Sequence, residues 1–197
     1  MKKIIPILFT VLLIVGCKDS DDATGPTGDP RSLVNTGWEL FEVGEYTEAL
    51  SNFSLASSID PGYTDATIGL GWANMRVTPP RLTDAINAFE SVLRVSANSN
   101  DAQAGKAFAL RGNAQYSEAE AAATVLLSRS TIWEFSHDES VNRQDLLVLR
   151  AACRFLIGNY ATALTALQEV EPTFSVDVST IEGRTQLGIR IEEWTRR

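Results

Sequence analysis

The stretch from Gly44 to Pro61, GEYTEALSNFSLASSIDP, decides the fold of this chain. Apolar and small residues recur in it at spacings of three, four and seven, which places them on one stripe of a helix. Gly44 ends a preceding helix over roughly Arg31 to Val43, and Pro61 stops the second helix. The stretch therefore predicts two helices joined by a glycine turn, with one stripe of packing residues: Tyr46, Ala49, Phe53 and Ala56.

The helical stripe recurs along the chain, with an alanine as its marker. Counterparts of Ala49 stand at Ala85, Ala119 and Ala163, at intervals of 36, 34 and 44 residues. The residues four and seven positions after each marker are again apolar or alanine. A larger side chain where the paired helices cross would overpack the contact. The first helix of each pair has a small residue at that crossing: Gly37, Gly71, Ala107 and Ala151.

Helix pairs joined by short turns and repeated at close to 34 residues resemble the tetratricopeptide (TPR) repeat, whose period is about 34 residues. The resemblance implies an all-α fold, a TPR-like α-solenoid of about four helix-turn-helix units with a C-terminal capping helix. The alternative is a non-repeating bundle of Ala-rich amphipathic helices. The four units are expected at about 30–63, 64–99, 100–143 and 144–178, and the capping helix at 179–197.

The third unit contains an insertion, Ser130 to Asn142, with the sequence STIWEFSHDESVN. It holds Trp133, Phe135 and the only histidine of the chain, His137. We expect the insertion to form a loop or an extended helix start, packed by its aromatic rings. The third and fourth units also depart from the repeat pattern, because they place Lys106 and Arg150 at a usually apolar position.

The last helix is expected to close the solenoid. Ser179 and Glu182 have the spacing of a capping box at its start. Terminal repeats need a lid with a polar outer side, and this helix would supply it. Its apolar stripe is expected to contain Ile181, Leu187, Ile191 and Trp194.

The chain opens with MKKIIPILFTVLLIVGC, a basic start followed by an apolar run. The run from Ile4 to Val15 is too short for a comfortable transmembrane helix. The sequence IVGC that ends at Cys17 resembles the lipobox of bacterial lipoproteins, in which the peptide is cut before the Cys and the Cys carries lipid. The resemblance implies a signal peptide at 1–16 and lipidation of Cys17. The alternative is an ordinary secretory peptide with an incidental Cys.

Residues 17–29 are expected to be the lipidated Cys and a disordered acidic tether, because this segment is polar and rich in Gly and Pro. The Asp that resembles an inner-membrane retention signal is absent after the Cys, where Lys18 stands. The acidic cluster that follows resembles the surface-export signal of lipoproteins from the Bacteroidetes, or is a solvated spacer. The predicted location is the bacterial cell envelope, lipid-anchored at the outer membrane, on its periplasmic face or the cell surface.

Composition and residue inventory argue against several classes of function. A formal net charge of −8 makes nucleic acid a poor partner, since phosphates demand clustered Lys and Arg. One histidine, His137, builds neither a His-based triad nor a two-His metal site. Cys153 aligns with alanines of earlier units and is expected to be a small buried residue. We therefore predict no enzyme, no metal and no cofactor.

The inner side of the first helices carries the candidate binding residues. In proteins that resemble this one, that side faces a concave groove. Aromatic anchors there bury much area with few rotatable bonds, and arginines suit carboxylates. The alternative is that Trp38 and Trp72 pack between adjacent repeats or are covered by the terminal helix. The predicted partner-binding groove comprises Trp38, Phe41, Trp72, Met75, Arg76, Phe108, Arg111 and Phe155.

These expectations lead to one function and one alternative. The first is a lipid-anchored TPR adaptor that binds a protein or peptide partner at the cell envelope. The resemblance implies roles in outer-membrane assembly, secretion or pilus biogenesis for such a protein. The alternative is an accessory lipoprotein that binds a glycan or another small ligand, because aromatic rings also stack on sugars.

Overall fold

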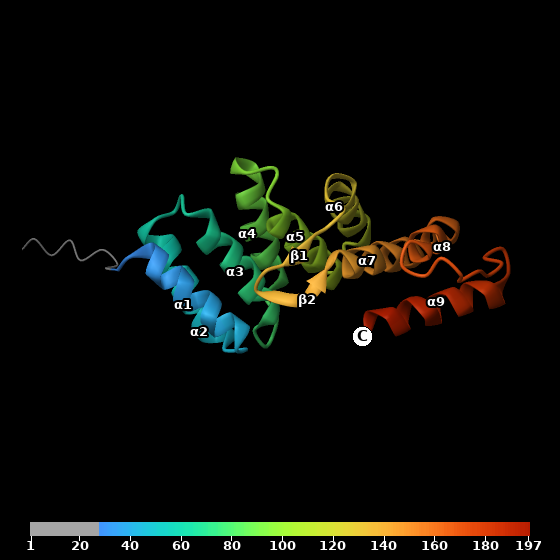
Figure 1. Ribbon diagram of the computed structural model, residues 1–197, viewed down its shortest axis with the longest axis horizontal. Coiled ribbons are helices and arrows are strands. Elements are labelled where there is room, and N and C mark those ends of the chain that lie inside the picture. The colour runs from blue at the N-terminus through green and yellow to red at the C-terminus, as the bar shows by residue number, and fades with distance from the viewer. Residues whose placement is uncertain (1–27) are drawn as a thin grey trace, which may run out of the picture.

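The computed structural model describes residues 28–197. The predicted signal peptide, Cys17 and most of the tether lie outside the described residues. Within them, the predicted four helix pairs and final helix are confirmed (Figure 1). The helices are α1 (Pro30–Glu42), α2 (Tyr46–Ile59), α3 (Thr64–Arg76), α4 (Leu82–Val95), α5 (Asn100–Gly112), α6 (Tyr116–Arg129), α7 (Arg143–Leu156), α8 (Tyr160–Gln168) and α9 (Ile181–Thr195).

The helices stack along one direction, with α1 and α2 at one end and α8 and α9 at the other (Figure 1). Each helix from α1 to α8 packs against its successor. The first helices α1, α3, α5 and α7 also pack against one another, so they form one row. Each of α2, α4 and α6 packs between two successive first helices. This arrangement is an α-solenoid.

Phenylalanines of the second helices fill the spaces between first helices. Phe53 of α2 is fully buried and lies against Gly37 of α1 and Gly69 of α3. A Cβ atom on Gly69 would come within 2.4 Å of the Phe53 ring. Phe89 repeats the arrangement between α3 and α5, where a Cβ on Gly105 would come within 2.2 Å of its ring. Small residues on the first helices are therefore what admits these rings.

The marker alanines and the turns agree with the repeat pattern. All four markers, Ala49, Ala85, Ala119 and Ala163, are fully buried. The turn before α2 holds Gly44 at φ +86°, a left-handed conformation that glycine adopts without steric strain. The same turn position in the third unit is Ala114, at φ +59°. The side chain of Ala114 makes this conformation less favourable, since Cβ crowds the following carbonyl oxygen.

The insertion between α6 and α7 forms a small antiparallel β-hairpin. Strands β1 (Glu134–Phe135) and β2 (Asp138–Asn142) pair with an irregular register, Phe135 opposite Asp138 and Glu134 opposite Asn142. The side chain of Asn142 then caps the start of α7 by accepting a hydrogen bond from the Gln144 N–H. The expected loop packed by its aromatic rings is therefore present, with a hairpin inside it and buried Trp133 and Phe135.

The two charged residues at usually apolar positions are paired. The ammonium group of Lys106 lies 2.8 Å from a carboxylate oxygen of Glu90. Arg150 is buried and donates a hydrogen bond to Glu169. Burial lowers the pKa of Arg150, and the carboxylate of Glu169 opposes that effect. The aliphatic stems of both side chains pack in the helix layers while their charges reach a carboxylate.

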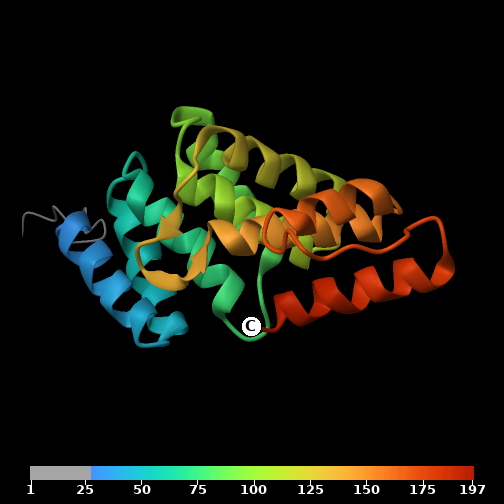
Figure 2. The same ribbon diagram turned by 45° about the vertical axis from the view of Figure 1, so that its right-hand side comes forward.

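Helix α9 packs mainly on α7 and only marginally on α8 (Figure 2). Leu187 and Ile191 are buried in this contact, as expected. Ile181 is 81% exposed, so its assignment to the apolar stripe was wrong. The predicted capping box is also wrong by one residue: the Oγ1 of Thr180 accepts the hydrogen bond from the Gly183 N–H, at 2.9 Å.

Candidate functional site

The β-hairpin lies over the inner face of α1, α3 and α5 (Figures 1 and 2). We use the word groove for this face, as lined by Trp38, Phe41, Trp72, Met75, Arg76 and Phe108. The insertion starts at the end of α6, crosses three repeats and returns to α7. The chain therefore lays one of its own segments across the row of predicted binding residues.

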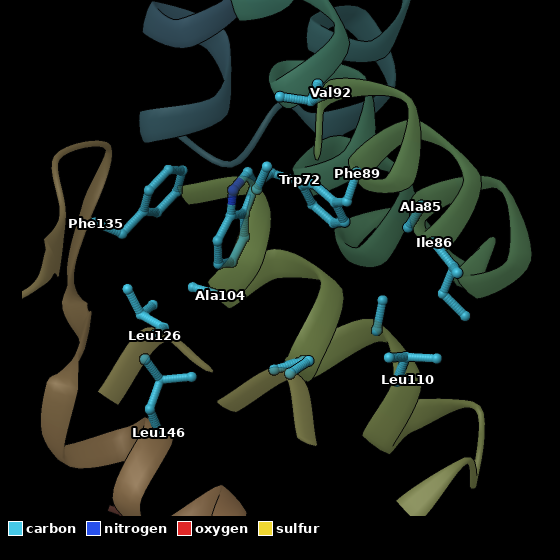
Figure 3. Close-up of a cluster of buried hydrophobic side chains, with 14 of the residues drawn as sticks. Trp72, Ala85, Ile86, Phe89, Val92, Ala104, Leu110, Leu126, Phe135 and Leu146 are labelled. Carbon is cyan, nitrogen blue, oxygen red and sulfur yellow. The ribbon is translucent and has the colours of Figure 1, made fainter. Parts of the chain in front are cut away.

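Phe135 occupies the centre of the groove. Its ring is fully buried and stacks on Trp72, with ring centroids 4.1 Å apart and planes 17° apart (Figure 3). The edges of Trp38 and Phe41 approach it from α1, with centroids at 5.9 and 6.1 Å. Aromatic pairs of this kind contribute about 0.5–1.5 kcal/mol beyond the area that they bury. Phe135 is thus the main apolar anchor of the hairpin.

His137 covers the second tryptophan. Its imidazole stacks on the Trp38 indole at a centroid distance of 3.8 Å, with planes 2° apart. Its Nδ1 lies 2.9 Å from a carboxylate oxygen of Glu42, at the end of α1. The flat ring and the polar atom therefore engage two side chains of the same helix. The only histidine of the chain is part of the hairpin contact.

Asp138 supplies a carboxylate to the groove. It accepts a hydrogen bond from Nη2 of Arg76 at 2.6 Å, and the two side chains are 25% and 35% exposed. Ser140 also donates its hydroxyl to the other oxygen of Asp138, at 2.5 Å. Arginine and carboxylate form a short charge-assisted hydrogen bond here. Arg76, which was expected to recognise carboxylates, binds one that belongs to this chain.

Two indole N–H groups at the groove donate to the aspartate at the second position of a first helix, and a third has no acceptor. Trp38 Nε1 donates to Asp65, the second residue of α3, at 3.2 Å. Asp101 is the second residue of α5, and it accepts a hydrogen bond from Trp133 Nε1 at 2.8 Å. Trp72 Nε1 is buried without a hydrogen-bond partner among the described residues. A buried N–H without an acceptor is unfavourable, since it has given up water.

A pocket of about 250 Å³ remains open beside the hairpin. It lies between β2, α3, α5 and the first turn of α7. Half-buried Phe108 and Met75 belong to its apolar lining, and Arg76 and Asp145 to its polar lining. The lining residues are Trp72, Met75, Arg76, Phe108, Ser140, Val141 and Asp145. This pocket is the part of the groove that the hairpin leaves accessible.

The predicted open aromatic row is wrong for this conformation. Trp38, Phe41 and Trp72 are 5%, 2% and 2% exposed. Of the two alternatives, burial is therefore correct: Trp38 and Trp72 contact the next repeat at Asp65 and Phe108, and the insertion covers them. The terminal helix lies at the other end, over the fourth unit. Sequence reasoning identified the aromatic rings of the insertion and did not place them on Trp38 and Trp72.

The two other predicted groove residues are Phe155, on α7, and Arg111, on α5. Phe155 is half-buried, packs edge-on against Tyr160 with centroids 5.3 Å apart, and contacts α9 at Gly188. It is a packing residue of the α7–α9 contact in this structure, and its role in partner binding stays a prediction. Arg111 is half-buried on α5. Its positive charge acts on Cys153, which is fully buried and whose pKa burial raises to about 11.

The described residues contain no cluster of three or more His, Cys, Asp or Glu side chains able to hold a metal ion. In the same part of the chain, no helix has the length and apolar character needed to cross a membrane. What the groove offers is rings, one arginine and a row of helix surfaces. Side chains of this kind are suited to contact with an apolar or acidic segment.

The comparisons with known proteins place the fold. No family model matches the chain, and no curated protein matches it significantly. Solved structures do: MamA 41-end from Desulfovibrio magneticus RS-1 is 17% identical, with a TM-score of 0.60 over 73% of this chain and 75% of that one. The TPR protein TTC0263 from Thermus thermophilus is 14% identical, with a TM-score of 0.58 over 86% of this chain and 82% of that one.

A third similar structure is YrrB, described as a TPR protein with an unusual peptide-binding site. It is 17% identical, with a TM-score of 0.60 over 85% of this chain and 78% of that chain. At such identities the likeness shows the fold alone. This chain has the TPR-like α-solenoid fold.

Proposed function

We propose that this protein is a TPR scaffold that binds a protein or peptide partner in the groove. One observation carries the proposal: a segment of the chain, residues 133–138, which forms β1 and the turn into β2, lies in the groove with contacts to three repeats. Two rings stack on indoles, and one carboxylate meets an arginine. A groove with these contacts for its own chain has the chemistry to hold a segment of another protein.

The same contacts favour a polypeptide over a glycan. A sugar needs an open aromatic face for stacking. The faces of Trp72 and Trp38 are taken by Phe135 and His137. The side chains that form the stacks and the Asp138 carboxylate are protein groups, so the contacts in the groove are those of a peptide.

We further propose that the scaffold is lipid-anchored at Cys17 in a bacterial cell envelope. The basic start, apolar run, small residue and Cys of the sequence support this location. One acyl chain gives only marginal membrane residence, so a stable anchor needs more than one. Outer-membrane assembly, secretion and pilus biogenesis are the processes in which such an anchored scaffold would act.

Proximity labelling in the native cell tests the scaffold proposal. A labelling enzyme fused to the full-length chain should mark a small set of envelope proteins. Met75→Glu, which puts a charge in the apolar lining of the pocket, should lose that set. Leu55→Glu on α2 is the matched control, because Leu55 is 37% exposed away from the groove. Equal labelling by the two variants would contradict the proposed binding face.

Metabolic labelling tests the anchor separately. Cells that express the full-length chain with radioactive palmitate should yield a labelled protein in the membrane fraction. Cys17→Ser should abolish the label and the membrane association. Retention of the label by the Ser variant would show that Cys17 is not the lipidation site.

A further inference from the structure

The contacts of the hairpin indicate which chemical groups the groove can bind. Each of its contacts uses a different kind of group: an aromatic ring on Trp72, a flat imidazole on Trp38 and a carboxylate on Arg76. The three groups come from Phe135, His137 and Asp138, within four consecutive residues. Phe135 ends β1 and His137 lies in the turn that follows it, so the tip of the hairpin presents the two rings to α3 and α1 together.

The repeat register indicates an alternative pairing between the indole N–H donors and the aspartate acceptors of the groove. Asp65 and Asp101 occupy the same position, the second residue of α3 and of α5. Trp38 donates to the first of them. By the same register Asp101 is the counterpart acceptor for Trp72, but its Oδ1 accepts a hydrogen bond from Trp133 of the insertion. Trp72 Nε1 is left buried and unpartnered among the described residues.

Release of the insertion would therefore restore the regular pattern. Asp101 would lose Trp133 as its donor and gain Trp72 from the neighbouring repeat. Docking exchanges one indole donor for another and leaves one unsatisfied, so this part of the contact supplies no net hydrogen bond. What holds the hairpin is the burial of Phe135 and Trp133, together with the partly exposed pair of Arg76 and Asp138.

The hairpin is also separable from the solenoid. Its strands are two and five residues long, and a two-stranded hairpin has little stability of its own. Helices α6 and α7 pack on each other like the other successive helices of the stack. The insertion leaves from the end of α6 and returns at Arg143, so the solenoid closes beneath it without the hairpin's help.

We propose that residues 133–141 are a built-in competitor for the groove, displaced by a partner segment of the same chemistry. That segment forms a tight turn and carries an aromatic ring followed, three residues later, by a carboxylate. This inference rests on the proposed scaffold function and adds the ligand class and its regulation. A tethered competitor acts at an effective concentration of the order of mM, so it lowers the apparent affinity for every partner.

The test uses the chain's own insertion as the probe. Residues 133–141 of the full chain are replaced by a Gly/Ser linker of equal length, and a fluorescein-labelled peptide of residues 132–142 is titrated by anisotropy. The emptied chain should bind the peptide at least about 10-fold more tightly than the wild-type chain. A folded emptied chain that does not bind the peptide, or equal binding by both chains, would overturn the proposal.

Charge reversal makes the test specific. A peptide with Asp138→Lys should bind the emptied chain about 10-fold more weakly. Arg76→Glu in the emptied chain should weaken binding of the native peptide and restore binding of the Asp138→Lys peptide, since only a direct pair gives such coupling. Reversal without restoration means that the peptide binds elsewhere, which also contradicts the proposal.

If the emptied chain loses its helical signal, the insertion is part of the core. A point variant of the full chain then tests the competitor role. Trp133→Phe keeps a ring and frees Asp101, so it should increase peptide binding by the full chain. Trp194→Phe is the matched control: it also loses an indole donor to a carboxylate, that of Glu171, but lies on α9 outside the groove, so binding should not rise. Equal responses would overturn the competitor role.

Two further outcomes separate the proposals. The wild-type chain could elute as a dimer in size-exclusion chromatography and become monomeric when the insertion is replaced. That result would identify the occupant of the groove as the insertion of a second copy, and it would refute a separate partner with an aromatic and acidic segment. An emptied chain that ignores the peptide but still marks its envelope partners refutes the competitor and leaves the scaffold. An emptied chain that binds the peptide while no cellular partner depends on Met75 refutes the scaffold's binding face alone.

Discussion

Replacing Phe135 with alanine distinguishes a docked hairpin from an integral core. Phe135 and Phe89 are both fully buried, and both rings contact Trp72. Loss of a buried Phe side chain from a cooperative core costs about 3–5 kcal/mol. We expect that loss for Phe89→Ala, because Phe89 lies between α3 and α5 and cannot leave without separating them.

The loss at Phe135 has an upper limit. When its ring is truncated, the hairpin can leave the groove while the helices stay folded, so the loss cannot exceed the free energy of docking. A docked state favoured about 10- to 100-fold corresponds to about 1.4–2.7 kcal/mol. We therefore expect Phe135→Ala to lower the free energy of unfolding by about 1–3 kcal/mol, less than Phe89→Ala.

Denaturant unfolding followed by helical circular dichroism measures both variants on one scale. The comparison includes the wild-type chain, Phe89→Ala and Phe135→Ala in one buffer. Equal slopes of the free energy of unfolding against denaturant concentration check that unfolding stays two-state. A loss at Phe135 equal to or greater than the loss at Phe89 would refute the view that the hairpin is separable from the solenoid.

Three other substitutions test parts of the fold. Gly105→Ala should lower the free energy of unfolding by about 1–3 kcal/mol, because the new Cβ meets Phe89 at 2.2 Å, whereas Gly112→Ala, whose Cβ meets the flexible end of Leu82 at 3.1 Å, should cost less. Ala114→Gly should stabilise the protein by about 0.5–1 kcal/mol, because glycine adopts the positive φ without strain. As a control, Ala121→Gly in the exposed middle of α6 should destabilise it by about 1 kcal/mol. Thermal melts measure both changes, and a lower melting temperature for Ala114→Gly would contradict the strain. Hydrogen bonds from Arg190 and Trp194 hold the pKa of the Glu171 carboxyl down at about 2, so the α9 anchoring it provides should be complete above pH of about 4.5 and fade as the pH falls toward 2. Glu171→Gln should remove this acid dependence from hydrogen exchange in α9, and an unchanged profile would contradict it.

The solenoid could be predicted from the sequence because its determinants are local. Alanine markers at a repeat period, a helical stripe and a small residue at each crossing are visible within one unit. They gave the helix pairs and the buried markers that the structure has. Gly69 and Gly105, which admit Phe53 and Phe89 from the preceding unit, escaped notice. They belong to contacts between units, which a pattern within a unit does not show.

The filling of the groove could not be predicted in this way. Arg76 and Asp138 are 62 residues apart in sequence, and Glu42 and His137 are 95 apart. Periodicity assigns faces to a helix but does not say which distant segment covers a face. One signal was present: Trp133, Phe135 and His137 alternate with polar residues, which is typical of a strand with one buried side.

The end of the chain illustrates the same limit. The sequence predicted a capping helix with a loose stripe, and α9 is present with Leu187 and Ile191 buried. It did not predict that α9 would pack mainly on α7. That position depends on the long connection after α8 and on the pair of Arg190 and Glu171, which only the folded chain brings together. As a result, Phe155 is a packing residue there.

Native-state hydrogen exchange of the full chain measures the central claim most directly. If the insertion is a competitor docked on a complete solenoid, amides of residues 134–142 should exchange through a local opening. Its free energy should lie at least about 2 kcal/mol below that of the slowest amides in α3 and α5. Exchange of these amides only through global unfolding, with the same free energy as the helices, would show that the hairpin is part of the core and contradict the account.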